Sequence, residues 1–110
     1  MVYDKNFKEM KIQDRELEKV LDEIQKEIQH VTGKRYTANL YDCDDCRFDV
    51  CIGKRDVRGT KLDIWITMYI DDRFGEFKTD ELTGVETPTD EEVYYIFENK
   101  INENFKRIVK

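Results

Sequence analysis

Three cysteines between positions 43 and 51 are the residues of this chain best suited to metal or thiol chemistry. Cys43 and Cys46 flank two aspartates in a CxxC motif, and Cys51 follows five residues later. Two thiolates at this spacing can share one tetrahedral zinc ion, but a structural zinc site needs four ligands. His30 or an aspartate would have to complete the set, since no second CxxC pair is present. The spacing favours three reduced thiols over a metal site, and we predict no cofactor.

The sequence around these cysteines disfavours a reactive thiol, and the rest of the chain lacks catalytic motifs. Four aspartates lie close to the CxxC motif, and their negative charge raises thiol pKa values; they are Asp42, Asp44, Asp45 and Asp49. They also lack the spacing and the glycine of a calcium loop. The chain has no serine, one histidine and no glycine-rich phosphate loop. We therefore predict a protein without enzymatic activity.

Acidic residues are concentrated in the last third of the chain. Between positions 71 and 92 there are nine carboxylates and two basic residues, in a chain of net charge −6. A helix dipole explains those at positions 90–92. We expect the others to form one exterior surface that attracts basic proteins, with plain solubilising charge as the alternative; they are Asp71, Asp72, Glu76, Asp80, Glu81 and Glu86.

The cationic residues form one group of note, at the tip of a predicted hairpin. It consists of Lys54, Arg55, Arg58 and Lys61. A nucleic-acid reader needs a larger basic face, and the sequence pI of about 4.9 argues against direct nucleic-acid binding. The group is either a solvated tip or a site of self-association with the acidic segment of a second copy.

Two stretches with apolar residues three and four apart predict helices. The first covers residues 14–31, ends near Gly33 and follows a shorter helical arm at 4–12; its stripe comprises Leu17, Val20, Leu21, Ile24, Ile28 and Val31. The second begins near Pro88, with Thr89 and Glu92 as the expected capping box, and continues almost to Lys110. Both helices are amphipathic, so each must bury one side.

Between the helices, the apolar period changes to two and predicts strands at 36–43, 47–53 and 62–70, with a weaker one at 76–82. The loop after the first strand sets the register. A two-residue loop at positions 44–45 would place Leu40 opposite Asp49, whereas a three-residue loop pairs Leu40 with Val50 and Ala38 with Ile52. We expect the longer loop, because it matches apolar with apolar residues.

This order predicts an α+β fold, a two-layer sandwich in which two helices cover one face of an antiparallel three- or four-stranded meander, αβββ(β)α. The 110 residues are expected to form one domain, with residues 1–12 as an N-terminal arm. We also expect a cytoplasmic protein, because the chain has three cysteines, no apolar run long enough for a bilayer and no recognisable signal peptide.

The long central strand predicts aromatic residues on the sheet face away from the helices. If Leu62 to Ile70 point into the core at alternate positions, Trp65 and Tyr69 point outward, with Thr67 between them and Cys51 and Tyr41 alongside. Tryptophan and tyrosine are typical anchors of protein interfaces. The alternative to a partner-binding surface is that the N-terminal arm covers this face with Tyr3, Phe7 and Met10.

These features favour a small acidic protein-binding module that occupies a basic, nucleic-acid-binding site on another protein and so excludes the nucleic acid. The size and charge are typical of phage and mobile-element inhibitors of anti-CRISPR or anti-restriction type, although no motif indicates a family. One alternative is an oligomerising scaffold, such as a homodimer, that uses helix 14–31 or the face with Trp65 and Tyr69. A CxxC metal or thiol protein is the other, and no membrane partner is expected.

Overall fold

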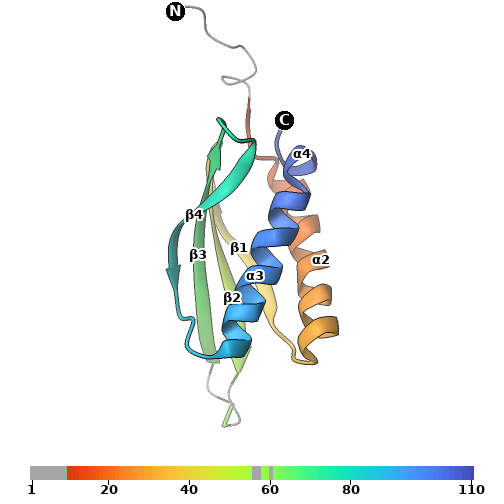
Figure 1. Ribbon diagram of the computed structural model, residues 1–110, viewed down its shortest axis with the longest axis vertical. Coiled ribbons are helices and arrows are strands. Elements are labelled where there is room, and N and C mark those ends of the chain that lie inside the picture. The colour runs from red at the N-terminus through yellow and green to blue at the C-terminus, as the bar shows by residue number, and fades with distance from the viewer. Residues whose placement is uncertain (1–9, 56–57, 60) are drawn as a thin grey trace, which may run out of the picture.

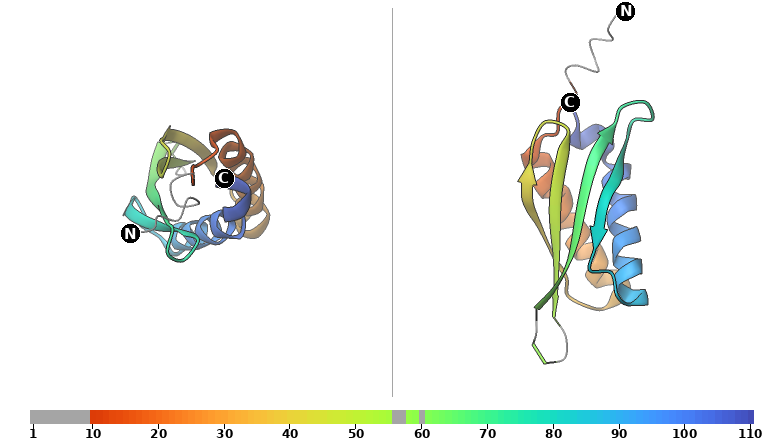
Figure 2. Two further views of the ribbon diagram at one scale, coloured as in Figure 1. Left: turned by 90° about the horizontal axis from the view of Figure 1, so that it is seen from above. Right: turned by 90° about the vertical axis from the view of Figure 1, so that its left-hand side faces the viewer.

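A four-stranded antiparallel sheet backed by helices forms the body of the protein (Figure 1). The computed structural model describes residues 10–55, 58–59 and 61–110. The elements follow the order α2 (Asp14–Thr32), β1 (Thr37–Cys43), β2 (Arg47–Arg55), β3 (Lys61–Asp71), β4 (Glu76–Thr83), α3 (Pro88–Glu103) and α4 (Phe105–Ile108). The strands are neighbours in chain order, and the helices lie on one face of the sheet (Figure 2). The predicted α+β architecture is confirmed, with four strands.

The core lies between this sheet and the helices. The predicted stripe of α2 is buried from Leu17 to Ile28, whereas Val31 in the last turn is 47% exposed. On the sheet side, Ile64, Ile66 and Met68 of β3 are fully buried. The apolar side of each long helix is therefore occupied within one copy of the chain. Among the described residues, no helix has the length and apolar character that crossing a membrane requires.

The described part of the predicted helical arm is not helical. Ile12 forms a β-bridge with Val109 near the carboxyl end of the chain. Lys11 and Lys110 exchange two backbone hydrogen bonds of 2.6 and 3.0 Å. Pairing with this second extended segment satisfies backbone groups that a helix would satisfy internally. The remainder of the arm, residues 1–9, lies outside the described residues.

The cap of α3 differs from the predicted one. Thr87 is the N-cap, its hydroxyl accepts the N–H of Asp90, and the Asp90 side chain completes the capping box. Pro88 occupies the first turn, where its missing N–H has no cost. The prediction of Thr89 and Glu92 was wrong by two residues. The helix also breaks at Asn104 before α4 continues the buried stripe.

The register of the first hairpin is the predicted one beyond the bulge and differs from it next to the turn. Leu40 pairs with Val50 and Ala38 with Ile52, while a β-bulge at Tyr41 shifts the pairing toward the turn. The turn itself is tight: the Asp44 carboxylate accepts the N–H groups of Cys46 at 3.0 Å and Arg47 at 2.9 Å. This side-chain contact stabilises the turn without a glycine. Residues 44–46 separate β1 from β2, as the longer loop predicted, and the bulge at Tyr41 separates the pairing next to the turn from the predicted pairing beyond it.

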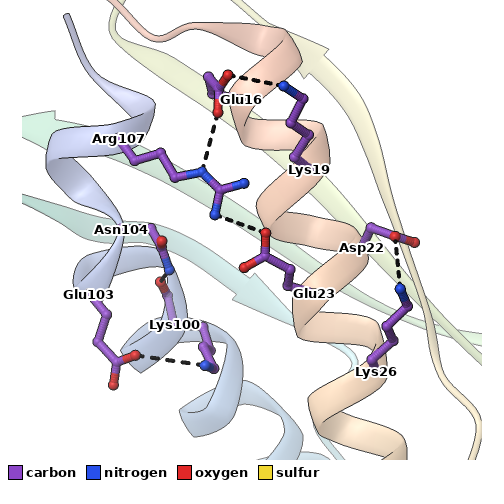
Figure 3. A network of polar contacts seen from close by, with 9 residues as sticks. All are labelled: Glu16, Lys19, Asp22, Glu23, Lys26, Lys100, Glu103, Asn104 and Arg107. Carbon is purple, nitrogen blue, oxygen red and sulfur yellow. Dashed lines mark hydrogen bonds and ion pairs between the residues drawn. The ribbon is translucent and has the colours of Figure 1, made fainter.

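An ion-pair network joins α2 and α4 (Figure 3). The guanidinium of Arg107 contacts Glu16 at 3.2 Å and Glu23 at 2.8 Å. Hydrogen bonds from Lys19 and Arg107 lower the pKa of Glu16. Because these groups are solvent-accessible, the network orients α4 against α2 but contributes little to stability.

Side-chain amides from the helices form hydrogen bonds with backbone groups at both edges of the sheet. At the β1 edge, Gln25 accepts the N–H of Ala38 at 3.0 Å. At the β4 edge, Asn102 accepts the N–H of Phe77 at 2.7 Å and donates to its carbonyl at 3.2 Å. An amide can replace a neighbouring strand at one residue, and such protection disfavours edge-to-edge association.

We therefore predict that Asn102→Ala lowers the free energy of unfolding by about 1–3 kcal/mol, because two partly buried hydrogen bonds are lost. Urea denaturation measures this loss, and light scattering should show increased self-association through the exposed β4 edge. The neighbouring substitution Glu103→Ala removes only a weak surface pair and should change stability by less than about 0.5 kcal/mol. Equal stabilities of the two variants would contradict the role of Asn102.

Candidate functional site

The sheet face away from the helices carries a row of carboxylates that runs across the strands. Cross-strand pairing connects Asp42 to Asp49, Asp49 to Thr67, and Thr67 to Glu81, one residue from each strand. Cross-strand partners point to the same face, and none of the helices that the structure describes covers this face (Figure 2). We call Asp42, Asp49 and Glu81 the carboxylate row. Neighbouring strands lie about 4.8 Å from one another, so the three acidic groups form one local surface.

The electrostatics of the carboxylate row are unfavourable within the monomer. Asp42 and Asp49 are direct cross-strand partners, and like charges in that arrangement destabilise a sheet. Their hydrogen bonds are neutral ones: Asp49 accepts the Thr67 hydroxyl at 2.6 Å, and Asp42 accepts the N–H of Cys43 at 3.0 Å. No described basic side chain forms an ion pair with any of the three carboxylates. The row therefore keeps its charge available for an external cation.

Aromatic side chains border the carboxylate row on both sides. Trp65 is 38% exposed and meets the ring of Tyr41 edge to face, with ring centroids 4.8 Å apart. Tyr41 is the bulged residue of β1 and is 72% exposed. A bulge redirects the side chain that it carries, which brings Tyr41 over the sheet toward β3. Tyr69 lies one cross-strand row beyond Thr67, between Arg47 and Lys78. The predicted outward placement of Trp65 and Tyr69 is confirmed.

Sequence reasoning missed two of the three carboxylates. Asp42 and Asp49 were considered only as neighbours of the cysteines, although Asp49 alternates with the buried residues Phe48 and Val50. That alternation, combined with the register, could have placed Asp49 on the outer face. Of the six predicted acidic residues, Glu81 belongs to the row. Asp80 is the bulged residue of β4 and pairs with Arg47 at 2.5 Å, which partly neutralises it.

The other predicted acidic residues do not form one surface with the carboxylate row, so the expectation of a single patch was wrong. Asp71 is buried, 3.4 Å from Arg73 and 3.6 Å from Lys78. Burial raises its pKa, but the hydrogen bonds and charge of Arg73 outweigh burial and lower the pKa overall. The rest are separated along the sheet: Asp72 and Glu76 lie at the β3–β4 turn, and Glu86 precedes α3 at the opposite end (Figure 1).

The structure does not assemble the cysteines into a metal site. Cys43 and Cys46 lie at the β1–β2 turn, whereas Cys51 faces outward from β2 beside Trp65. In the described part of the chain, no three histidine, cysteine or acidic side chains form a group that could hold a metal ion. Burial, followed by the charges of nearby aspartates, raises the pKa of Cys43 to about 11. The pKa of Cys46 is also raised, by the same causes.

The predicted cationic group at the hairpin tip does not include Lys54. Lys54 is not at a solvated tip but forms an ion pair with Asp90, with side-chain exposures of 10% and 2%. Burial raises the pKa of Asp90, but hydrogen bonds from Lys54 and from the N–H of Glu86 outweigh it, so the pKa is lowered. Lys54 therefore fixes the β2 end of the hairpin to the start of α3. Arg58 is exposed, and the side chains of Arg55 and Lys61 lie outside the described residues.

Comparison of the chain with protein-family models, with curated proteins and with solved structures gave no match. The function is therefore argued from the chemistry of the outer sheet face alone.

The cysteine environment predicts slow alkylation of Cys43. At pH 8, the increase of the pKa from 9.0 to about 11 lowers the fraction of thiolate about a hundredfold. A more basic thiolate is also more nucleophilic, and this raises the reaction rate about tenfold in partial compensation. Iodoacetamide should then modify Cys43 about tenfold more slowly in the native protein than in the urea-unfolded chain, as followed by peptide mass spectrometry. Equal rates in the two states would contradict this environment.

The buried ion pair predicts a large effect of Lys54→Met. This substitution leaves the Asp90 carboxylate buried without its cation, and it should lower the free energy of unfolding by about 3–5 kcal/mol. Urea denaturation measures the change. Lys26→Met is the matched control, since Lys26 forms only an exposed pair with Asp22, and it should change stability by less than about 1 kcal/mol. A Lys54 variant as stable as this control would show that the pair does not anchor the hairpin.

Proposed function

We propose that this protein is a non-catalytic protein-binding module whose outer sheet face binds a basic surface on another protein. The observation that carries the proposal is the carboxylate row, in which Asp42 and Asp49 face one another and form no ion pair with a described basic side chain. A lysine or arginine from a partner would relieve this repulsion. Complementary charge accelerates association and selects the partner.

The aromatic residues beside the row supply the second component of an interface. Tyr41 and Trp65 form a preorganised pair, and large, partly exposed aromatic side chains contribute much of the binding free energy in protein complexes. Arginine is the partner residue best suited to this surface, because its planar guanidinium stacks on aromatic rings and also pairs with carboxylates.

The outer face is favoured over two other surfaces. The apolar stripe of α2, an alternative site of oligomerisation, is already buried against the sheet from Leu17 to Ile28. Strand addition at the sheet edges is disfavoured, because Gln25 and Asn102 occupy backbone groups there. The face with Trp65 and Tyr69 keeps exposed aromatic and acidic side chains together.

Competition with nucleic acid would follow from this mode of binding. A protein surface rich in lysine and arginine is also the surface that contacts phosphates, so an acidic module bound there excludes the nucleic acid. The role we propose is accordingly that of a cytoplasmic inhibitor of a nucleic-acid-binding protein, such as a CRISPR or restriction effector.

Trp65 provides a direct test, because it is the only tryptophan in the chain. Its fluorescence should change saturably when the protein is titrated with a nine-residue arginine peptide. The triple variant Asp42→Asn, Asp49→Asn, Glu81→Gln should weaken this binding about tenfold or more, since three ion pairs of about 0.5–1 kcal/mol are lost. The variant should be at least as stable as the parent, because like-charge repulsion is relieved.

The matched control carries the same change of charge on the helix layer: Glu18→Gln, Glu92→Gln, Glu103→Gln. It should bind the peptide within about twofold of the parent, because the contribution of distant exposed charges is screened. Equal weakening in the control and the row variant, or no saturable change in the parent, would overturn the proposed surface. Affinity capture with the parent and with the Asp42/Asp49/Glu81 variant then tests which class of protein binds this surface.

A further inference from the structure

The α2–β1 loop and the start of α3 lie at the same end of the sheet (Figure 1). Residues of both segments line a cavity of about 820 Å³. This volume lies within the range of small-molecule sites. It is on a different part of the molecule from the carboxylate row, since its walls come from the α2–β1 loop, from β2 and from the segment that begins α3. The charged residues that line it are Lys34, Arg35, Lys54, Glu86 and Asp90, and Tyr36, Thr37 and Thr87 add hydroxyl groups.

The wall of the cavity contains a fixed polar cluster. Asp90 accepts hydrogen bonds from the Tyr36 hydroxyl at 3.2 Å, from the N–H of Glu86 at 3.0 Å and from Lys54. Lys54 also donates to the carbonyl of Gly84 at 3.1 Å. An ammonium group has three donors, and these two contacts leave one N–H of Lys54 unassigned among the described residues. The cation is thus held in one position beside the cavity.

A buried ion pair of this kind is a costly way to stabilise a fold. Desolvation of the two charges offsets most of their attraction, so apolar residues often stabilise a core equally well. Charged groups with several convergent hydrogen bonds in a cavity wall are typical of binding sites. The Lys54–Asp90 pair thus has a structural role at the start of α3 and also places two charged groups in the wall of the cavity.

Two further cations that line the cavity form no ion pair within the described part of the chain. Lys34 and Arg35 are exposed, and no ion pair joins either side chain to another described residue. With Lys54, they give the charged lining three cations against the two carboxylates Glu86 and Asp90. The lining therefore has an excess of one positive charge, in a chain of net charge −6, and this local excess favours an anion over a cation.

We propose that this cavity binds a small organic phosphate monoester. The phosphate group can pair with Lys34 and Arg35, and Arg35 can contact two phosphate oxygens at once. Lys54 directs its remaining N–H to the same group. Tyr36 and Leu62 also line the cavity and provide apolar surface for the organic part of the molecule. This ligand site is independent of the proposed protein-binding face.

Phenyl phosphate is the probe that tests the site, with isothermal titration calorimetry and amide chemical shifts as the two readouts. We expect saturable binding that shifts the amide signals of Lys34 to Tyr36 and of Lys54. The double variant Lys34→Gln, Arg35→Gln should bind at least tenfold more weakly. Its matched control, Lys26→Gln with Lys106→Gln, removes the same charge elsewhere and should bind like the parent.

Three outcomes would overturn the proposal: no saturable binding of phenyl phosphate, equal weakening in the control variant, or shifts confined to residues outside the cavity. Benzyl alcohol, which lacks the phosphate, should not bind, and binding equal to that of phenyl phosphate would likewise exclude an anion site. The arginine-peptide titration followed by Trp65 fluorescence should be unchanged in the Lys34/Arg35 variant, so failure of either proposal can be distinguished from failure of the other.

Discussion

The structure depends on one constraint: a four-stranded sheet is buried on one face only. The helices and the inward residues of the strands fill a single core, and the apolar stripe of α2 is used there. The opposite face must then be compatible with water. Its exposed tryptophan and tyrosines therefore stand out, because they are not needed for the core, and they lie beside carboxylates that form no ion pair with a described side chain.

Two β-bulges determine what that outer face presents. The bulge at Tyr41 sets the pairing of Asp42 with Asp49 and brings the ring of Tyr41 to Trp65. The bulge at Asp80 brings Glu81 opposite Thr67 and lets Asp80 reach Arg47. Because each bulge adds one residue to an edge strand, it changes which side chains share a row. The carboxylate row is a product of these two irregularities.

Charge is distributed in the fold by pairing as well as by composition. Asp71, Asp80 and Asp90 have basic partners within the chain, so much of the acidic segment is neutralised where it lies. Among the described charges that form no ion pair, Asp42, Asp49 and Glu81 lie together on the outer face, and Lys34 and Arg35 lie together at the cavity. Sites that attract ions of opposite sign can coexist in one small protein because water and salt screen them from each other.

The sequence by itself determined the element order, the helix stripes, the outward direction of Trp65 and Tyr69 and the register of the first hairpin, because periodicity and apolar matching are local properties. Only the tertiary structure decided which charged side chains are buried, which are exposed and which form ion pairs. Whether Asp71 is exposed, or whether Lys54 reaches Asp90 thirty-six residues away, depends on contacts between distant segments. The bulges could not be predicted from the sequence either, since an extra residue in a strand leaves the alternation almost intact. The assembly of Asp42, Asp49 and Glu81 into one row depends on these bulges, so it was equally hidden.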